Sequence, residues 1–190
     1  MNKPFVADQT FKGENYTQNR LQKGEYENCI FESCDFSNGY LDNQNFMECT
    51  FIDCNLSNTN LRHTTFNEVD FENCKMMGLK FENCNDFLMH FGFDNCTLNF
   101  SSFFGLSLKS QVFNNCKLID VDFTETDLSS ASFDGSDLNR ALFERSKLEK
   151  ADFRSAYNFS LDPEQNRLKK AKFSKEGALG LLMKYDIVIE

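Results

Sequence analysis

A strict five-residue period is the feature of this sequence that most limits its fold. Every fifth residue from Phe11 to Phe81 is large and apolar, and the same period runs from Phe93 to Phe153 after a shift of two residues. An α-helix repeats every 3.6 residues and a flat strand repeats every two, so neither element produces this pattern. A strict internal repeat of this kind predicts a solenoid, in which each repeat stacks on the next.

The position two residues before each apolar centre is usually small, as at Gly24, Cys29 and Thr59. Two inward positions in every five, separated by one outward residue, describe a short extended segment followed by a turn. Four such segments can close a square, which predicts a coil of 20 residues. Backbone hydrogen bonds would then run between stacked coils.

Reading the sequence at 20-residue intervals tests this coil. With two extra residues allowed between positions 82 and 92, one column contains only phenylalanine: Phe11, Phe31, Phe51, Phe71, Phe93, Phe113, Phe133 and Phe153. A second column contains five cysteines before it changes to Ser136 and Ala156: Cys34, Cys54, Cys74, Cys96 and Cys116. We therefore predict an all-β parallel solenoid of about seven coils, which would be about 34 Å long at the spacing of β-strands.

The period divides the chain into three parts. Residues 1–8 lack the period and are predicted to be a lead-in, residues 9–156 form the solenoid, and residues 157–190 form a C-terminal segment. In that segment Ser174 is a candidate N-cap for a helix over about 175–185, and residues 186–190 are predicted to form a strand. The segment either caps the open end of the solenoid or pairs with a second subunit. The residues expected at such a dimer contact are Leu179, Leu182, Met183, Ile187 and Ile189.

The two-residue insertion within 82–92 has two interpretations. It is either a bulge that the solenoid tolerates or a contact point formed by Phe87, Met89 and His90. Insertions on regular scaffolds often carry recognition.

Composition and residue placement argue against catalysis, metals and cofactors. The eight cysteines all lie on one phase of the repeat, which favours buried filler over a zinc site. Both histidines, His63 and His90, fall on outward positions. The net charge of −9 argues against direct nucleic-acid or membrane-surface binding. The absence of a long apolar stretch or a secretory signal predicts a cytoplasmic protein with reduced thiols.

The repeat units resemble a known family. Residues 54–58 (CNLSN), 126–130 (TDLSS) and 151–155 (ADFRS) are similar to the A(D/N)LXX unit of pentapeptide-repeat proteins. This resemblance implies a right-handed quadrilateral β-helix.

Residues 66–78 and the C-terminal segment resemble one group within that family, the quinolone-resistance proteins and the microcin B17 and albicidin immunity proteins. The resemblance implies a cytosolic homodimer, joined through its C-terminal ends, that mimics B-DNA. It also implies binding to DNA gyrase or topoisomerase IV and protection against topoisomerase poisons. The quinolone-resistance proteins usually carry two projecting loops, whereas this chain has only the short insertion near Phe87.

The repeat register assigns most acidic residues to two adjacent faces of the predicted rod. The acidic residues expected to bind a partner are Glu32, Glu48, Asp53, Glu68, Asp70, Glu72 and Asp94. A basic DNA-binding groove would attract such a surface. The alternative is a scaffolding repeat protein, which would bind its partner through the bulge and exposed apolar residues such as Phe100 and Phe104.

Overall fold

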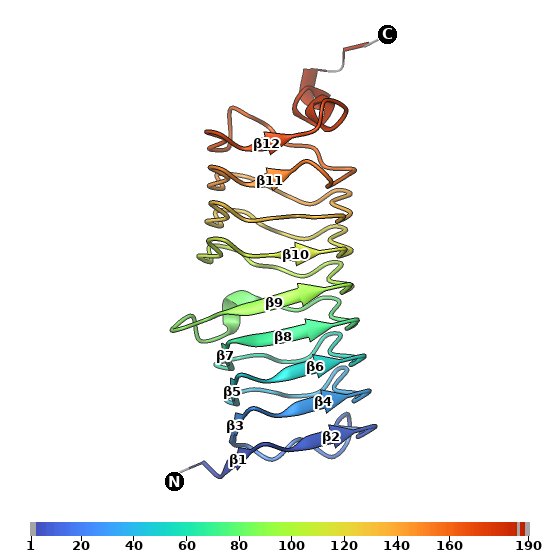
Figure 1. Cartoon of the computed structure of the whole chain (residues 1–190), viewed down its shortest axis with the longest axis vertical. Coiled ribbons are helices and arrows are strands. Elements are labelled where there is room, and N and C mark those ends of the chain that lie inside the picture. The colour runs from blue at the N-terminus through green and yellow to red at the C-terminus, as the bar shows by residue number, and fades with distance from the viewer. Residues whose placement is uncertain (1–2, 186, 189–190) are drawn as a thin grey trace.

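Square coils stacked into a rod make up the computed structural model, which describes residues 3–185 and 187–188 (Figure 1). One sheet contains four strands: β1 (Phe5–Ala7), β3 (Glu25–Glu27), β5 (Asn45–Met47) and β7 (Thr65–Asn67). A second sheet contains six strands: β2 (Thr10–Lys12), β4 (Ile30–Glu32), β6 (Thr50–Ile52), β8 (Val69–Glu72), β9 (Phe91–Asp94) and β10 (Phe113–Asn114). The last pair is β11 (Asp152–Phe153) and β12 (Lys172–Phe173). All of these strand pairs are parallel.

The strand register confirms the 20-residue coil. Phe31 pairs with Phe51, and Phe51 pairs with Phe71, each one coil apart. The next pairing joins Phe71 to Phe93, which places the two extra residues of the insertion between β8 and β9. The predicted all-β solenoid is therefore confirmed, and it has about eight turns.

The parallel ladder is longer at both ends than the five-residue period indicates. At the start, β1 pairs with β3, so residues expected to form only a lead-in already lie in the first coil. At the other end, Phe153 pairs with Phe173, beyond the expected limit at residue 156. The apolar period fails at Asn158 and Pro163 but returns at Leu168 and Phe173. Because one coil is irregular, an unbroken five-residue period does not include the final turn of the solenoid.

Stacked aromatic rings fill the inside of the square. Phe31 and Phe51 stack with ring centroids 4.7 Å apart, and Phe133 and Phe153 stack at 4.8 Å. Rings from neighbouring faces meet edge to face, as Phe113 and Phe123 do at 5.7 Å. Both ring arrangements are favourable for aromatic pairs. The core is therefore a continuous column rather than a central cluster.

The small inward residue of each repeat is also a hydrogen-bond donor. The thiol of Cys54 donates to the carbonyl oxygen of Phe31 at 3.2 Å. The hydroxyl of Ser136 makes the equivalent bond to the carbonyl oxygen of Phe113 at 3.1 Å. Cysteine, serine and threonine share this position because each is small and can donate to a backbone carbonyl.

The corners of the coils require a left-handed backbone. Asn28, Asn38 and Asn58 have φ values of 49°, 53° and 55°. Asparagine tolerates this conformation better than most residues, which explains its abundance at the last position of the repeat. Longer side chains also occur at corners, and Phe100 has φ 63°.

Short 3-10 helices, η2 (Gly177–Leu181) and η3 (Met183–Tyr185), replace the helix expected over 175–185. The N-cap residue of η2 is Glu176 rather than the expected Ser174, but Ser174 Oγ accepts a hydrogen bond from the Gly177 N–H at 2.9 Å. Gly180 packs so closely on Phe159 that a side chain there would overlap the carbonyl oxygen and the ring. The side chain of Lys184 forms an ion pair with Asp162 at 2.7 Å, which links this segment to the preceding coil.

The C-terminal strand expected over 186–190 is not observed in the part of it that is described. Ile187 and Val188 lie outside any strand, and residues 186, 189 and 190, which include the predicted contact residue Ile189, lie outside the described residues.

Candidate functional site

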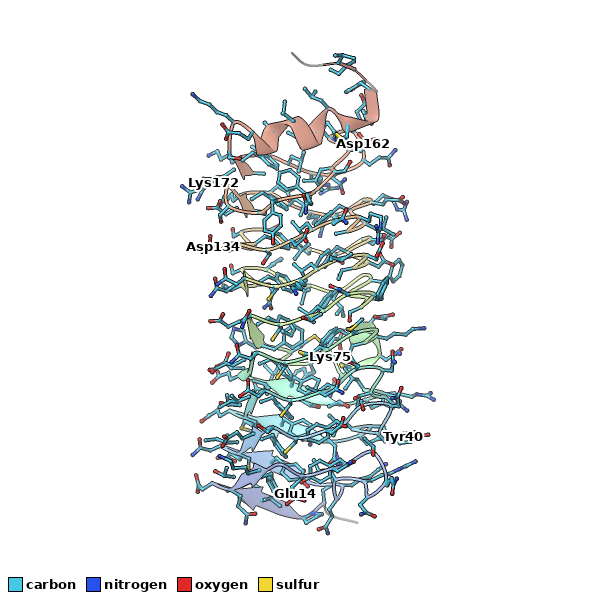
Figure 2. All side chains as sticks on the ribbon, turned by 90° about the vertical axis from the view of Figure 1, so that its right-hand side faces the viewer. Glu14, Tyr40, Lys75, Asp134, Asp162 and Lys172 are labelled. Carbon is cyan, nitrogen blue, oxygen red and sulfur yellow. The ribbon has the colours of Figure 1, made fainter. Side chains whose placement is uncertain are left out.

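Two adjacent faces of the rod carry the predicted acidic residues. Face A is the outer surface of the sheet β1-β3-β5-β7 and of its continuation through the parallel bridges that join Ser107, Asp127, Lys147 and Arg167. Face B is the outer surface of the six-stranded sheet and of β11 and β12. Figure 2 shows Asp134 and Lys172, both from face B, projecting from the same side of the rod. In a typical strand the middle residue points inward and its two neighbours point outward.

The structure brings all seven predicted acidic residues onto these faces and their corners. Face B contains four of them in its strands and one at its outer corner: Glu32, Asp70, Glu72, Asp94 and Asp53. The corner shared by faces A and B carries the other two, Glu48 and Glu68. The strand β3 adds Glu25 and Glu27 to face A. The acidic residues therefore form one continuous surface, called here the acidic patch.

The acidic patch has almost no internal compensation. Glu32 forms an ion pair with Lys12 at 2.7 Å. Within residues 3–185, no other carboxylate of the patch lies within 4.0 Å of a basic side chain. Eight carboxylates thus remain unpaired: Glu25, Glu27, Glu48, Asp53, Glu68, Asp70, Glu72 and Asp94. Their mutual repulsion favours a cationic partner.

Several acidic residues in the C-terminal half of the rod are neutralised by basic neighbours. Asp127 contacts Lys147 at 3.1 Å, and Asp152 contacts Arg154 at 2.7 Å. The contacts to Asp152 lower the pKa of its carboxyl group to about 2, chiefly through the hydrogen bond from Arg154. The sequence register spread the acidic surface along the whole of both faces. The structure pairs Asp127 and Asp152, whereas Asp134 and Glu149 of the same two faces form no ion pair among the described residues. The unpaired charge is therefore greatest in the first half of the rod.

Many of these ion pairs join residues 20 positions apart, as Asp120 and Arg140 do at 2.5 Å and Glu125 and Arg145 do at 2.9 Å. Reading charges as well as apolar residues down the columns would have found them. The five-residue period also did not assign Arg167, Lys169 and Lys170 to face A, because it is interrupted before Leu168.

A hollow of about 480 Å³ interrupts face B beside the patch. Its lining includes Asp70, Glu72, Asp94, Lys109 and Val112. Gly92 also lines it, and a methyl group at this position would displace the carboxylate of Asp70. The hollow leaves backbone accessible among carboxylates, which gives a basic side chain of a partner room to enter.

The insertion forms a bulge that projects from face A between η1 (Phe81–Asn83) and β9 (Figure 1). Phe87 and Leu88 have exposed fractions of 71% and 62%. Met89, expected to project with Phe87, instead packs against the core, and Leu88 takes the exposed place with φ 58°. His90 is exposed, and its carbonyl oxygen accepts the Val69 N–H at 3.1 Å. The bulge therefore presents two apolar side chains without breaking the ladder.

The C-terminal cap exposes the apolar residues predicted for a dimer contact. Leu179, Leu182, Met183 and Ile187 are all exposed. A hollow of about 640 Å³ lies between the cap and the last coil and is lined in part by Phe159, Gly180 and Met183. This end of the rod could accept apolar side chains from another molecule.

The eight cysteines are buried free thiols. Burial raises the pKa of Cys49 to about 11 and that of Cys116 to about 12, so these thiols stay protonated near neutral pH. Across the described part of the chain, no group of three or more histidine, cysteine or acidic residues is placed to hold a metal ion. Among the same residues, no helix is long and apolar enough to cross a membrane.

Comparisons with known proteins agree with this architecture. The sequence matches the family model described as "Pentapeptide repeat region" over residues 25–103 and 80–153. No curated protein sequence matches the chain.

Among solved structures, the chain is similar to HetL, a pentapeptide-repeat protein involved in heterocyst differentiation regulation from Nostoc sp. strain PCC 7120. The TM-score is 0.58 at 15% identity, and the match covers 92% of this chain and 88% of HetL. It is also similar to a trypsin-treated form of QnrB1, a plasmid-mediated fluoroquinolone resistance protein. Here the TM-score is 0.49 at 19% identity, with coverage of 98% and 100%.

Proposed function

The chain belongs to the pentapeptide-repeat family, and on that premise we propose that it is a partner-binding protein that mimics DNA. In this proposal the acidic patch takes the place of the phosphate backbone and occupies the DNA-binding groove of DNA gyrase or topoisomerase IV. The unpaired carboxylates of the patch carry the proposal. The protein would act in the cytoplasm, where it would give immunity or resistance to a poison of that topoisomerase.

The charge density of the acidic patch supports this proposal. Eight unpaired carboxylates are spread over four coils, which span about 19 Å at the spacing of β-strands. The same length of duplex carries about eleven phosphates. The patch therefore approaches the charge density of DNA, although the rod as a whole does not. A groove lined with lysine and arginine would attract both surfaces.

The exposed cap supports a homodimer as part of this proposal. Pairing two caps through Leu179, Leu182, Met183 and Ile187 would cover these apolar side chains and double the length of the rod. Each end of such a dimer would present one acidic patch, so that two equivalent sites on a symmetric topoisomerase could be reached.

The second candidate function is a scaffold that binds a protein partner through apolar contacts. It is favoured by one observation, the exposure of Phe87 and Leu88 at the tip of the bulge. Exposed apolar tips on rigid scaffolds are typical of protein recognition. This function needs no topoisomerase and no acidic patch.

Charge reversal in the patch separates the two functions. We expect Glu72→Lys/Asp94→Lys to weaken binding to gyrase by at least about tenfold, because close charge reversal opposes electrostatic complementarity. The control is Glu14→Lys/Glu144→Lys, which reverses two exposed acidic residues on the other two faces; Glu14 forms no ion pair among the described residues, and Glu144 has only a 3.7 Å contact with the exposed Arg145. Binding and DNA supercoiling by gyrase would be measured with and without ciprofloxacin or albicidin. Equal binding by the patch variant and the wild type would reject the mimicry. Loss of gyrase binding only in Phe87→Ser/Leu88→Ser would show that apolar contacts at the bulge, rather than the acidic patch, hold the partner.

A further inference from the structure

Face A has opposite charge in its two halves. Its first half carries five carboxylates and one lysine, Lys3: Asp8, Glu25, Glu27, Glu48 and Glu68; a further exposed carboxylate, Asp86, lies in the bulge. Its second half carries six basic residues: Lys109, Lys147, Lys150, Arg167, Lys169 and Lys170. Two acidic residues also lie in the second half, and one of them, Asp127, is held by Lys109 and Lys147. Although the chain as a whole has a net charge of −9, the charge of face A changes from negative to positive along the rod.

The charged residues of both halves lie in the same columns. One column contains Glu25 and, farther along the rod, Lys147 and Arg167. The corner column contains Glu48 in the first half and Lys150 and Lys170 in the second half, all with φ between 52° and 63°. Side chains of opposite sign therefore project in the same direction from the two halves of one face, on either side of the bulge.

The most basic part of face A is not neutralised internally. Lys150, Arg167, Lys169 and Lys170 form no ion pair with any residue in 3–185. All four are exposed. The unpaired positive charge faces outward in the same way as the unpaired negative charge at the other end.

The middle of face A exposes apolar side chains, flanked by Asp86 and His90. The bulge lies between the acidic and the basic half and presents Phe87 and Leu88. Met47, on the acidic side of the bulge, is also 42% exposed. An apolar centre with charged margins is the usual composition of a protein interface.

We propose that face A binds face A of a second copy of this chain, with the two rods antiparallel. The two-fold axis would lie in the plane of the interface and run parallel to the strands. It would pass between the bulge and the Ser107–Lys109 segment of the next coil. An isologous interface requires a self-complementary surface, and a face that is negative on one side of its centre and positive on the other satisfies this requirement. The parallel arrangement would place carboxylates against carboxylates, so the charge pattern selects the antiparallel one.

This axis sets the register of the pair. Because the axis preserves each column, Glu25 lies opposite Arg167 of the partner subunit, and Glu27 lies opposite Lys169 of the partner subunit. At the corner, Glu48 lies opposite Lys150 of the partner subunit. The two bulges lie side by side at the centre, which covers Phe87 and Leu88.

The pairing is independent of the topoisomerase proposal and differs from pairing through the C-terminal cap. It would cover Glu25, Glu27 and Glu48 but leave Glu72 and Asp94 of face B exposed. A topoisomerase that needs the whole acidic patch would compete with the second copy.

Charge-swapped variants test this pairing. The acid-reversed variant is Glu25→Lys/Glu27→Lys/Glu48→Lys, and the base-reversed variant is Lys150→Glu/Arg167→Glu/Lys169→Glu. The matched control, Arg62→Glu/Lys80→Glu/Lys117→Glu, reverses three exposed basic residues on the other two faces. All chains would also carry Leu182→Glu/Met183→Glu, so that the C-terminal cap does not contribute to association. Mass would be measured by sedimentation equilibrium at about 50 mM and about 500 mM salt, because screening weakens exposed charge pairs.

We expect the chain with an unchanged face A to form a dimer of twice 22.0 kDa at low salt and to dissociate at high salt. Each reversed variant alone should dimerise at least about tenfold more weakly, whereas an equal mixture of the two should recover the dimer. The control should behave as the wild type does.

A mixture that stays at 22.0 kDa would overturn the proposal, as would a wild-type face that is monomeric at low salt. A fluorescent DNA duplex provides the last comparison. If the base-reversed variant loses binding to this duplex while the mass of the wild type never changes, the basic half binds nucleic acid and the pairing is wrong.

Discussion

Phe51 provides the most direct test of the stacked core. Its ring is fully buried and lies between Phe31 at 4.7 Å and Phe71 at 5.1 Å. Phe46 and Phe36 meet it edge to face at 5.3 Å and 5.9 Å. Replacing a buried phenylalanine with alanine costs about 3–5 kcal/mol, and the loss is greatest where the site cannot collapse. Both neighbouring coils are fixed by backbone ladders, so we expect Phe51→Ala to lower the free energy of unfolding by about 4–5 kcal/mol.

Phe11 is the matched control because it ends the same column. It is only partly buried, and it has one stacked neighbour, Phe31, at 4.8 Å. Phe11→Ala should therefore cost about half as much as Phe51→Ala. Phe51→Leu keeps most of the apolar volume and should cost less than about 2 kcal/mol.

Urea unfolding followed by far-ultraviolet circular dichroism and by tyrosine fluorescence would measure these values. Two probes are needed because stacked repeats can unfold in parts rather than in one step. Equal losses for Phe51→Ala and Phe11→Ala would refute the view that stacking on both sides holds each coil.

Three further predictions follow from single positions. Phe100→Asn should stabilise the protein by about 1 kcal/mol, because asparagine suits the left-handed corner; a lower urea midpoint would contradict this. Cys54→Ser should cost about 1 kcal/mol less than Cys54→Val, because serine can still donate to the carbonyl oxygen of Phe31; equal midpoints would show that only size matters. The raised pKa of Cys116, about 12, favours the protonated thiol in the folded state, so stability should fall as the pH rises above the ordinary value of 9.0. Thiol titration and urea midpoints at increasing pH would measure this, and rapid labelling of native protein at pH 8 would contradict it.

The sequence period was sufficient to predict the coil, the position of the insertion and the buried cysteines. These follow from a rule that repeats, since an inward residue in one coil requires an equivalent residue in the next. The same rule aligns Phe93 with Phe71 from the sequence alone. The last coil was missed because Asn158 and Pro163 break the period while Phe159 and Leu161 maintain the core.

The candidate site was predictable in position but not in charge balance. The seven acidic residues fall on two faces, as the register indicates. Whether a carboxylate is neutralised depends on side chains one coil away, such as Lys147 beside Asp127. The five-residue period also could not predict which side chains of the bulge are exposed. Leu88 is exposed and Met89 packs against the core because Leu88 has a left-handed backbone conformation.

A competition measurement tests the DNA-mimic proposal most directly. Labelled protein bound to DNA gyrase would be titrated with an unlabelled DNA duplex at several salt concentrations. The proposal predicts that the duplex displaces the protein, that affinity falls steeply with salt, and that Glu72→Lys/Asp94→Lys binds poorly throughout. Simultaneous binding of duplex and protein, with an affinity that salt does not change, would contradict it.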